Sequence, residues 1–139
     1  MRYLGLDLGS RTLGVAVSDA TGTVANSVKI IRHHEDYDAL VGEVCDLVRE
    51  YDAKEIVLGF PKNMNGTIGF KGELSIDFKE KLEEALSIPV VLQDERLTTK
   101  SATDLLITGG VSRKKRKEVI DAVAATIILQ SYLDRREEK

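Results

Sequence analysis

The chain has 139 residues and a net charge of −3, and 42% of its residues are hydrophobic while 31% are charged. This length and composition fit one soluble domain spanning residues 1–139, and the negative charge argues against a broadly basic nucleic-acid-binding protein. Trp is absent and aromatic residues make up only 5%, so a platform of aromatic side chains for stacking bases is not expected.

The first third of the chain predicts three β-strands with short connections. Apolar and β-branched residues dominate residues 2–8, 13–18 and 24–31, and turn-forming residues fill 9–12 and 21–23. Connections this short are typical of an antiparallel meander.

Helices and strands alternate in the rest of the chain. Apolar residues between Leu40 and Tyr51 recur at the spacing of one helix face. The remaining predicted elements are a strand at 55–59, a helix through 74–86, a strand at 88–93, a helix at 98–107 and a last helix at 115–135. Residues 62–72 and 109–117 are rich in glycine and polar side chains, and we expect them to be mobile connections.

This order of elements predicts an α/β fold with a five-stranded mixed sheet, three antiparallel strands and then two parallel ones, flanked by helices. Right-handed crossovers place the fourth and fifth strands beside the first. No apolar stretch reaches the roughly 18 residues of a membrane span, and no signal peptide precedes the first strand. The single Cys45 excludes an intramolecular disulfide, and we expect a small buried hydrophobe rather than a reactive thiol in a cytoplasmic protein.

Three acidic residues lie far apart in the chain but at related places in this fold. Asp7 ends the first apolar run, Glu95 follows the fifth strand, and Asp121 shares a stripe of the last helix with Ala125. The carboxyl ends of parallel strands form the usual ligand-binding edge of open α/β sheets. Two other interpretations stay open, namely that Asp7 caps the turn after its strand and that Asp121 pairs with a nearby cation.

Clustered carboxylates repel one another and lose solvation, so they need a compensating cation. Carboxylate oxygens suit Mg²⁺ or Mn²⁺, and two such ions can stabilise the attacking and leaving oxygens of a phosphodiester. The sequence therefore predicts that Asp7, Glu95 and Asp121 are both catalytic and metal-binding. His33 and His34 lack the spacing of metal ligands, and we expect both to be exposed.

A basic run precedes the last apolar helix and consists of Arg113, Lys114, Lys115, Arg116 and Lys117. Cations near a helix N-terminus oppose the helix dipole, which favours an anionic partner such as a phosphate backbone. A solvated basic loop is the alternative. Arg96, Lys100 and Asn65 are further candidates for contact with nucleic acid, although Arg96 could pair with an acid and Asn65 could serve only the loop.

Four motifs resemble the YqgF/RuvX family of RNase H-like nucleases over nearly the whole chain. They are Leu6-Asp7-Leu8-Gly9 with Gly14-Val15-Ala16, Gly59-Phe60-Pro61 with Asn65-Gly66-Thr67, Asp94-Glu95-Arg96-Leu97-Thr98-Thr99, and Asp121-Ala122-Val123-Ala124-Ala125 with Ile128-Leu129-Gln130. The resemblance implies an RNase H-like fold, with Asp7, Glu95 and Asp121 as the catalytic acids. Where relatives often carry an Arg, this chain has Lys71, a point charge without bidentate phosphate recognition.

The resemblance also implies a Mg²⁺- or Mn²⁺-dependent endonuclease that matures the 5′ end of pre-16S rRNA, as a monomer or weak dimer acting with the small ribosomal subunit. The alternatives are a Holliday junction resolvase acting on DNA, which would need a dimer, and a non-catalytic RNA-binding scaffold. Residues 7–14 also resemble the phosphate loop of actin-like kinases and ATPases. Those enzymes close two lobes around a nucleotide, and this chain supplies only one.

Overall fold

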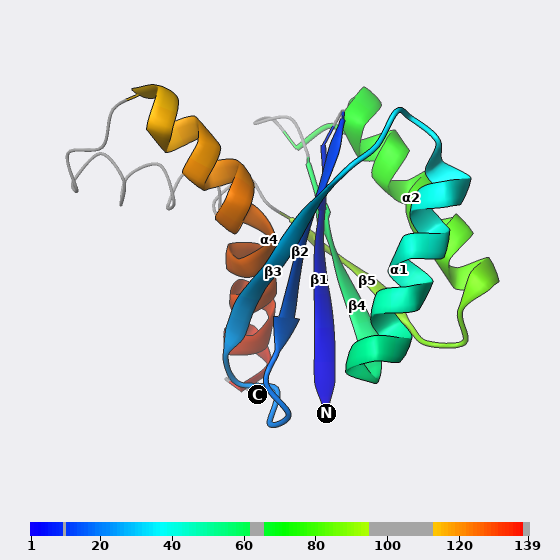
Figure 1. Ribbon diagram of the computed structural model, residues 1–139, viewed down its shortest axis with the longest axis vertical. Helices are drawn as coiled ribbons and strands as arrows, with labels where there is room; N and C mark the ends of the chain where they lie inside the picture. Colours follow the sequence, from blue (N-terminus) through cyan, green and yellow to red (C-terminus); the bar gives the residue numbers. More distant parts are fainter. Residues whose placement is uncertain (10, 62–65, 95–112, 138–139) are drawn as a thin grey trace.

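The computed structural model describes residues 1–9, 11–61, 66–94 and 113–137, without the side chains of 113–122 and 136–137. The strands are β1 (Arg2–Leu8), β2 (Thr12–Ser18), β3 (Ala25–Arg32), β4 (Ala53–Phe60) and β5 (Val90–Asp94), and the helices are α1 (Tyr37–Tyr51), α2 (Phe70–Ala85) and α4 (Arg113–Glu137) (Figure 1). The helix predicted at 98–107 lies outside the described residues. None of the helices in the described ranges has both the length and the apolar character needed to cross a bilayer.

The strands form one mixed sheet in the order β3-β2-β1-β4-β5. β2 pairs antiparallel with β1 and β3, whereas β4 pairs parallel with β1 and β5. The predicted meander and the predicted place of the fourth strand beside the first are therefore confirmed, whereas β5 pairs with β4 and not with β1. The ends of the three parallel strands, Leu8, Phe60 and Asp94, lie at one edge of the sheet, which we call the carboxyl edge.

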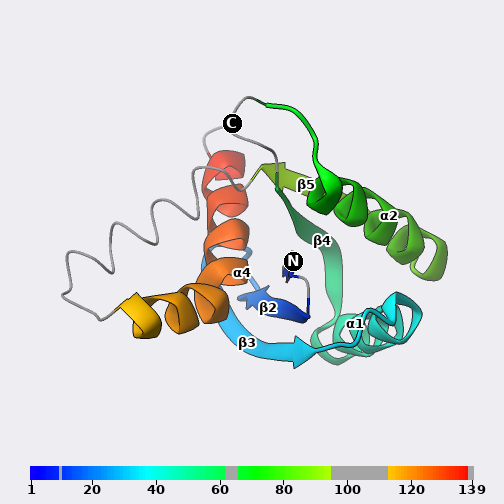
Figure 2. The same cartoon turned by 90° about the horizontal axis from the view of Figure 1, so that it is seen from above.

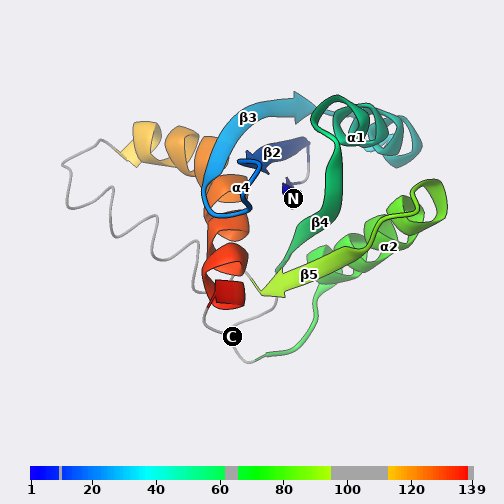
Figure 3. The ribbon, with the colours of Figure 1, turned by 90° about the horizontal axis from the view of Figure 1, so that it is seen from below.

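Helices cover both faces of the sheet. Viewed along the sheet from above and from below, α1 and α2 lie on one side and α4 lies on the other (Figures 2 and 3). Leu4 and Leu6 of β1 are fully buried under α1 and α2, where each contributes roughly 1.5–3 kcal/mol. Cys45 is half-buried against the same core, while Tyr3 packs with Leu129 on the α4 side.

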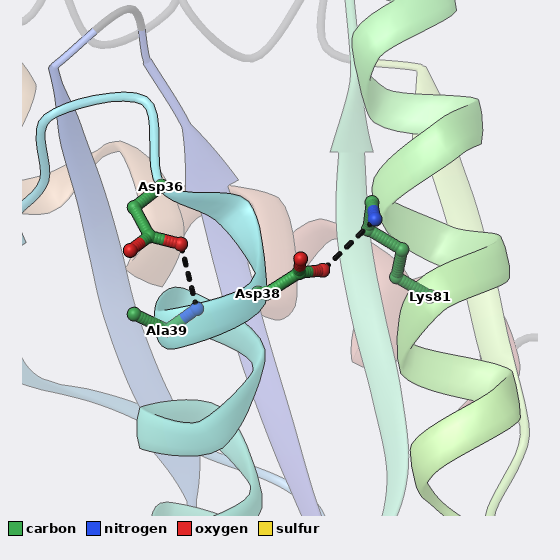
Figure 4. A network of polar contacts seen from close by, with 4 residues as sticks. All are labelled: Asp36, Asp38, Ala39 and Lys81. Carbon is green, nitrogen blue, oxygen red and sulfur yellow. Dashed lines mark hydrogen bonds and ion pairs between the residues drawn. The ribbon is translucent and has the colours of Figure 1, made fainter.

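Side chains at the start of α1 define its first turn and its link to α2. The Asp36 carboxylate caps the helix because its Oδ1 accepts a hydrogen bond from the Ala39 amide at 3.1 Å (Figure 4). Lys81 Nζ of α2 donates to Asp38 Oδ1 at 2.9 Å, and this hydrogen bond raises the pKa of the Lys81 ammonium. Both side chains are exposed, so this pair links α1 to α2 but contributes little to the free energy of folding.

Two helices begin earlier than the sequence predicts. α2 begins at Phe70, inside the predicted connection 62–72, and its Gly72 is a packing residue rather than a helix breaker. A Cβ at Gly72 would lie 2.8 Å from Ile68 Cγ2 and 2.9 Å from the Pro61 carbonyl oxygen. α4 likewise begins at Arg113. The prediction of loop structure is therefore wrong for the parts of 62–72 and 109–117 that these helices contain.

Polar contacts fix the C-terminal half of α4 to the sheet. Gln130 Oε1 accepts from the Ala25 amide at 2.9 Å, and its Nε2 donates to the Thr23 carbonyl at 2.9 Å. Nearer the end of the helix, Arg135 Nη1 donates to Gln93 Oε1 of β5 at 3.4 Å. These contacts reach β3 and β5, the outermost strands on the two sides of the sheet. The C-terminal half therefore sets the direction of α4 across the strands.

Candidate active site

Asp7 lies at the carboxyl edge, on the sheet face that α4 covers. Along β1, Tyr3 and Gly5 pack against α4, whereas Leu4 and Leu6 join the core under α1 and α2. Because side chains alternate along a strand, Asp7 shares the α4 face with Tyr3 and Gly5. The residue is half-buried.

Glycines flank Asp7 on both neighbouring strands. Gly14 of β2 is its direct partner across the antiparallel pair, and the parallel register of β1 and β4 puts Gly59 beside it on the other side. Gly59 in turn pairs with Gln93 of β5. Neither neighbouring strand therefore places a side chain next to the carboxylate. The groups nearest to the carboxylate on this face therefore have to come from α4 or from the segments that follow the parallel strands.

The helix above this face approaches β1 closely. A Cβ at Gly5 would lie 2.7 Å from Leu129 Cβ and 3.0 Å from the Ala125 carbonyl oxygen. β1 and α4 run in opposite directions (Figure 1). Asp121 lies one helical turn before Ala125 in α4, so it precedes this close contact along the helix, and its side chain is not among those that the structure describes.

The third predicted acid, Glu95, lies outside the described residues and follows directly after Asp94, the last residue of β5. Gln93 faces α4, where it meets Arg135. Alternation places the half-buried Asp94 on the opposite face. Among the side chains that the structure describes, no three His, Cys, Asp or Glu residues form a group that could hold a metal ion.

Of the predicted contacts to nucleic acid, Lys71 is the one whose side chain is described, and it is exposed in the first turn of α2. Asn65, Arg96 and Lys100 lie outside the described residues. The basic residues 113–117 form the first turns of α4, which extend away from the sheet at the end of the molecule that holds the carboxyl edge (Figure 1).

His33 is only 6% exposed, which contradicts the predicted exposure of both histidines, while His34 is exposed as predicted. The Nδ1 atom of His33 accepts a hydrogen bond from the Glu35 amide at 3.2 Å, and the Nε2 atom of His33 lies 3.2 Å from the Gly9 carbonyl oxygen. Because Nδ1 accepts, the proton of the neutral ring is on Nε2 and is donated to Gly9. His33 thus ties the turn after Asp7 to the segment before α1.

A cavity of about 270 Å³ opens at the carboxyl edge on the α1 and α2 side of the sheet. Its lining residues are Leu8, Gly9, Glu35, Tyr37, Phe70, Lys71 and Leu74. They come from the end of β1, the start of α1 and the start of α2, which meet at the same end of the molecule (Figure 1). The sequence analysis named Leu8 and Gly9 within a family motif and Lys71 as a possible phosphate contact, but nothing in the sequence indicated that these separate segments form one cavity.

Comparison with known proteins identifies the family. Residues 1–135 match the RuvX family, described as Holliday junction resolvase. A Bacillus licheniformis protein named "Putative pre-16S rRNA nuclease" is 54% identical over 137 residues, which cover 96% of this chain and 97% of that protein. Proteins of the same name from Bacillus subtilis and Caldanaerobacter subterraneus are each 53% identical over 135 residues, covering 96% of this chain and 98% and 96% of theirs.

Solved structures agree on the fold. RuvC of Thermus thermophilus in complex with a Holliday junction substrate superposes with a TM-score of 0.63 at 14% identity, covering 100% of this chain and 97% of RuvC. A ROK hexokinase of the same organism reaches a TM-score of 0.50 at 25% identity, but the match covers only 35% of the hexokinase. The match covers 71% of this chain, and the likeness extends to about a third of the hexokinase, as expected for one lobe. With matches to the family and to its relatives along nearly its whole length, this chain belongs to the RuvX family and has an RNase H-like fold.

Proposed function

We propose that this chain is a divalent-metal-dependent endonuclease that hydrolyses nucleic-acid phosphodiesters and processes the 5′ end of pre-16S rRNA. The observation that carries the proposal is the position of Asp7 at the carboxyl edge, between Gly14 and Gly59 and under a closely packed helix. Relatives above 50% identity are named for this substrate, which supports rRNA as the nucleic acid.

The donor chemistry at this position fits a divalent ion. Asp7 offers hard carboxylate oxygens, and the glycines beside it on both neighbouring strands add no side chain that would compete with a ligand. Asp7, Glu95 and Asp121 would together hold two Mg²⁺ or Mn²⁺ ions, since oxygen ligands are those that these ions prefer. When bound, the ions supply charge stabilisation to the attacking and leaving oxygens of the phosphodiester.

The chain's own residues position the substrate. β1 lies between two paired strands, so the backbone that carries Asp7 is held on both sides, and His33 fixes the turn that follows. Cations at the carboxyl edge would hold the phosphate backbone and fix its register. The residues proposed for this role are Lys71, Arg96, Lys100 and Arg113–Lys117, with Asn65 as a polar contact. Because the whole chain carries a net charge of −3, binding depends on these local cations and should weaken steeply with salt.

A second candidate substrate is a four-way DNA junction. The family description names Holliday junction resolvase, and RuvC bound to such a junction has the same fold. Symmetric cleavage of a junction requires two active sites and hence a dimer, whereas trimming an rRNA end requires one. The mass of the active species in solution therefore separates the two candidates.

The test is cleavage of a pre-16S rRNA fragment and a four-way DNA junction, side by side, with Mg²⁺ or Mn²⁺. Asp7→Asn should lose nearly all cleavage and remain folded. Asp46→Asn is the matched control, because it makes the same change at an exposed α1 carboxylate that pairs with Arg49, and it should keep full activity. Chelation with EDTA should stop cleavage and added Mg²⁺ should restore it.

Each outcome of this test has a distinct meaning. Cleavage of the RNA alone supports the processing nuclease, and symmetric cleavage of the junction by a dimer favours the second candidate. Asp7→Asn with near wild-type activity would refute the proposed role of this carboxylate. Binding without cleavage of either substrate would favour a non-catalytic scaffold.

A further inference from the structure

We propose that the cavity between β1, α1 and α2 binds one unpaired nucleobase of the substrate strand, with the adjoining phosphate on Lys71. The inference rests on the proposed nuclease function and adds a subsite to it. Two cavity residues, Leu8 and Gly9, directly follow Asp7. Consecutive Cα atoms are about 3.8 Å apart, so the cavity wall begins next to the candidate catalytic carboxylate. The cavity opens on the sheet face opposite to the Asp7 side chain. A nucleic-acid strand that crosses the carboxyl edge to reach Asp7 therefore passes the mouth of the cavity.

The lining of the cavity suits the flat face of a base. Phe70 is 76% exposed, more than any other large hydrophobic side chain in the described part of the chain. Its ring makes no contact with another described aromatic ring, whereas Tyr37, which also lines the cavity, packs against Phe78 at 6.4 Å and His33 at 5.6 Å between ring centroids. One fixed ring and one available ring in the same lining fit a stacking site, because every base offers a π-face.

The charges at the rim orient the nucleotide. Lys71 belongs to α2, whereas Glu35 lies in the segment before α1, two residues from Tyr37. A phosphate is attracted to the ammonium and repelled by the carboxylate, so the backbone lies over α2 and the base points toward Glu35. The Glu35 carboxylate only accepts hydrogen bonds, so it pairs with an N–H donor on the edge of the base, and each of the four bases offers one. The cavity of about 270 Å³ is at the small end of ligand pockets and suits one base rather than a base pair.

The rim that carries Glu35 is held in place by a contact within the chain. Glu35 adopts a positive φ of 63°, a conformation uncommon for a residue with a side chain. Its amide donates to His33 Nδ1, and the same ring reaches the Gly9 carbonyl on the neighbouring wall. The buried His33 therefore joins two walls of the cavity, which gives this histidine a reason to be buried.

A tryptophan reporter tests for base stacking directly. The chain has no Trp, so Phe70→Trp introduces a single tryptophan, whose fluorescence reports on the cavity. In an Asp7→Asn background, which prevents cleavage, single-stranded RNA should quench this fluorescence, while an abasic ribose-phosphate strand of the same length should not. Val24→Trp in the same background is the matched control, because Val24 is 49% exposed in the β2–β3 connection, away from the carboxyl edge. Neither the RNA nor the abasic strand should change the fluorescence of this control variant.

Binding measurements separate the base from the phosphate. Phe70→Ala should weaken binding of single-stranded RNA by about 5- to 10-fold, the low end of values for one stacked base, and leave binding of the abasic strand unchanged. Because Phe70 is exposed, the Phe70→Ala variant should unfold at the wild-type melting temperature. Lys71→Gln should weaken binding of both strands and reduce the salt slope by about 1.

Equal quenching by the two strands, or RNA binding without quenching, would overturn the subsite. The outcome is distinguishable from failure of the nuclease proposal. A chain that cuts RNA but gives no base-dependent quenching lacks the subsite and keeps its function. A chain that gives base-dependent quenching but cuts no substrate keeps the subsite as part of a binding protein.

Discussion

Replacing Gly5 with alanine should damage activity more than stability, because it forces α4 away from β1. The new Cβ would lie 2.7 Å from Leu129 Cβ and 3.0 Å from the Ala125 carbonyl oxygen. Carbon atoms pack best at about 3.5–4.0 Å, so relief of the first contact requires a movement of roughly 1 Å. Both opposing atoms are fixed to the helix backbone. No side-chain rotation removes the contacts, and the helix itself must move.

The expected magnitudes follow from that displacement. Overpacking of this kind costs about 1–3 kcal/mol. For a domain of this size each kcal/mol lowers the melting temperature by roughly 4 °C, which gives a fall of roughly 4–12 °C. In the proposed site α4 carries Asp121, so the same movement separates it from Asp7 by roughly 1 Å. A misplacement of that size can lower kcat by about 10²-fold.

The assay combines thermal unfolding by circular dichroism with cleavage of the rRNA fragment well below the melting temperature. Gly42→Ala is the matched control, because Gly42 is exposed in α1 and a Cβ there meets nothing within 4 Å. It should stabilise the protein by about 0.4–1 kcal/mol and leave kcat unchanged. Gly5→Ala melting at the wild-type temperature would refute the close approach of α4. A lower melting temperature with full kcat would refute the coupling of α4 to the reaction.

Three further results are expected. His33→Ala should lower the free energy of unfolding by about 1–3 kcal/mol in urea, because the partly buried Glu35 amide and Gly9 carbonyl lose their partner, and His33→Gln should recover part of that loss. Asp19 accepts a hydrogen bond from the Thr21 hydroxyl and others from nearby amides, which lower its pKa from 3.8 to about 2. The pKa of Asp19 is lower in the folded state, so its stabilisation is present above pH 3.8 and is lost as the pH falls through 2. The difference in unfolding free energy between the wild type and Asp19→Asn should therefore shrink over this pH range. A constant difference would contradict the prediction. Asp38→Asn should lower the Lys81 pKa in an NMR titration, since Asp38 is the main cause of its raised value.

The strands were predictable because their signal is local. Alternation with a period of two depends on neighbouring residues, and each observed strand begins and ends within two residues of the prediction. The order of the strands followed from the short early connections and the handedness of the later ones. The face of Asp7 followed from the same alternation, since Leu4 and Leu6 could not leave the larger core without exposing it.

The features that the sequence did not predict depend on contacts between distant segments. Burial of His33 comes from the Gly9 carbonyl, 24 residues away, and two adjacent histidines in a polar stretch give no local sign of it. The start of α2 was missed because Gly72 was taken as a loop residue, whereas close packing against Pro61 and Ile68 excludes a side chain there. Glycine has the same local meaning in both cases, and only the tertiary neighbour distinguishes them.

Composition was also a weak guide to base recognition, for a related reason. Aromatic residues make up 5% of the chain, which argued against a stacking platform, but composition counts rings without placing them. One exposed ring at Phe70 and one fixed ring at Tyr37 are enough to hold one base if they lie on facing walls. The same reasoning applies to Asp7, where a carboxylate replaces the apolar side chain that would suit the face under α4, and where Gly14 and Gly59 add no packing of their own. Three consecutive positions across the sheet thus contribute no apolar side chain to the core under α4, which an ordinary strand at this place would supply.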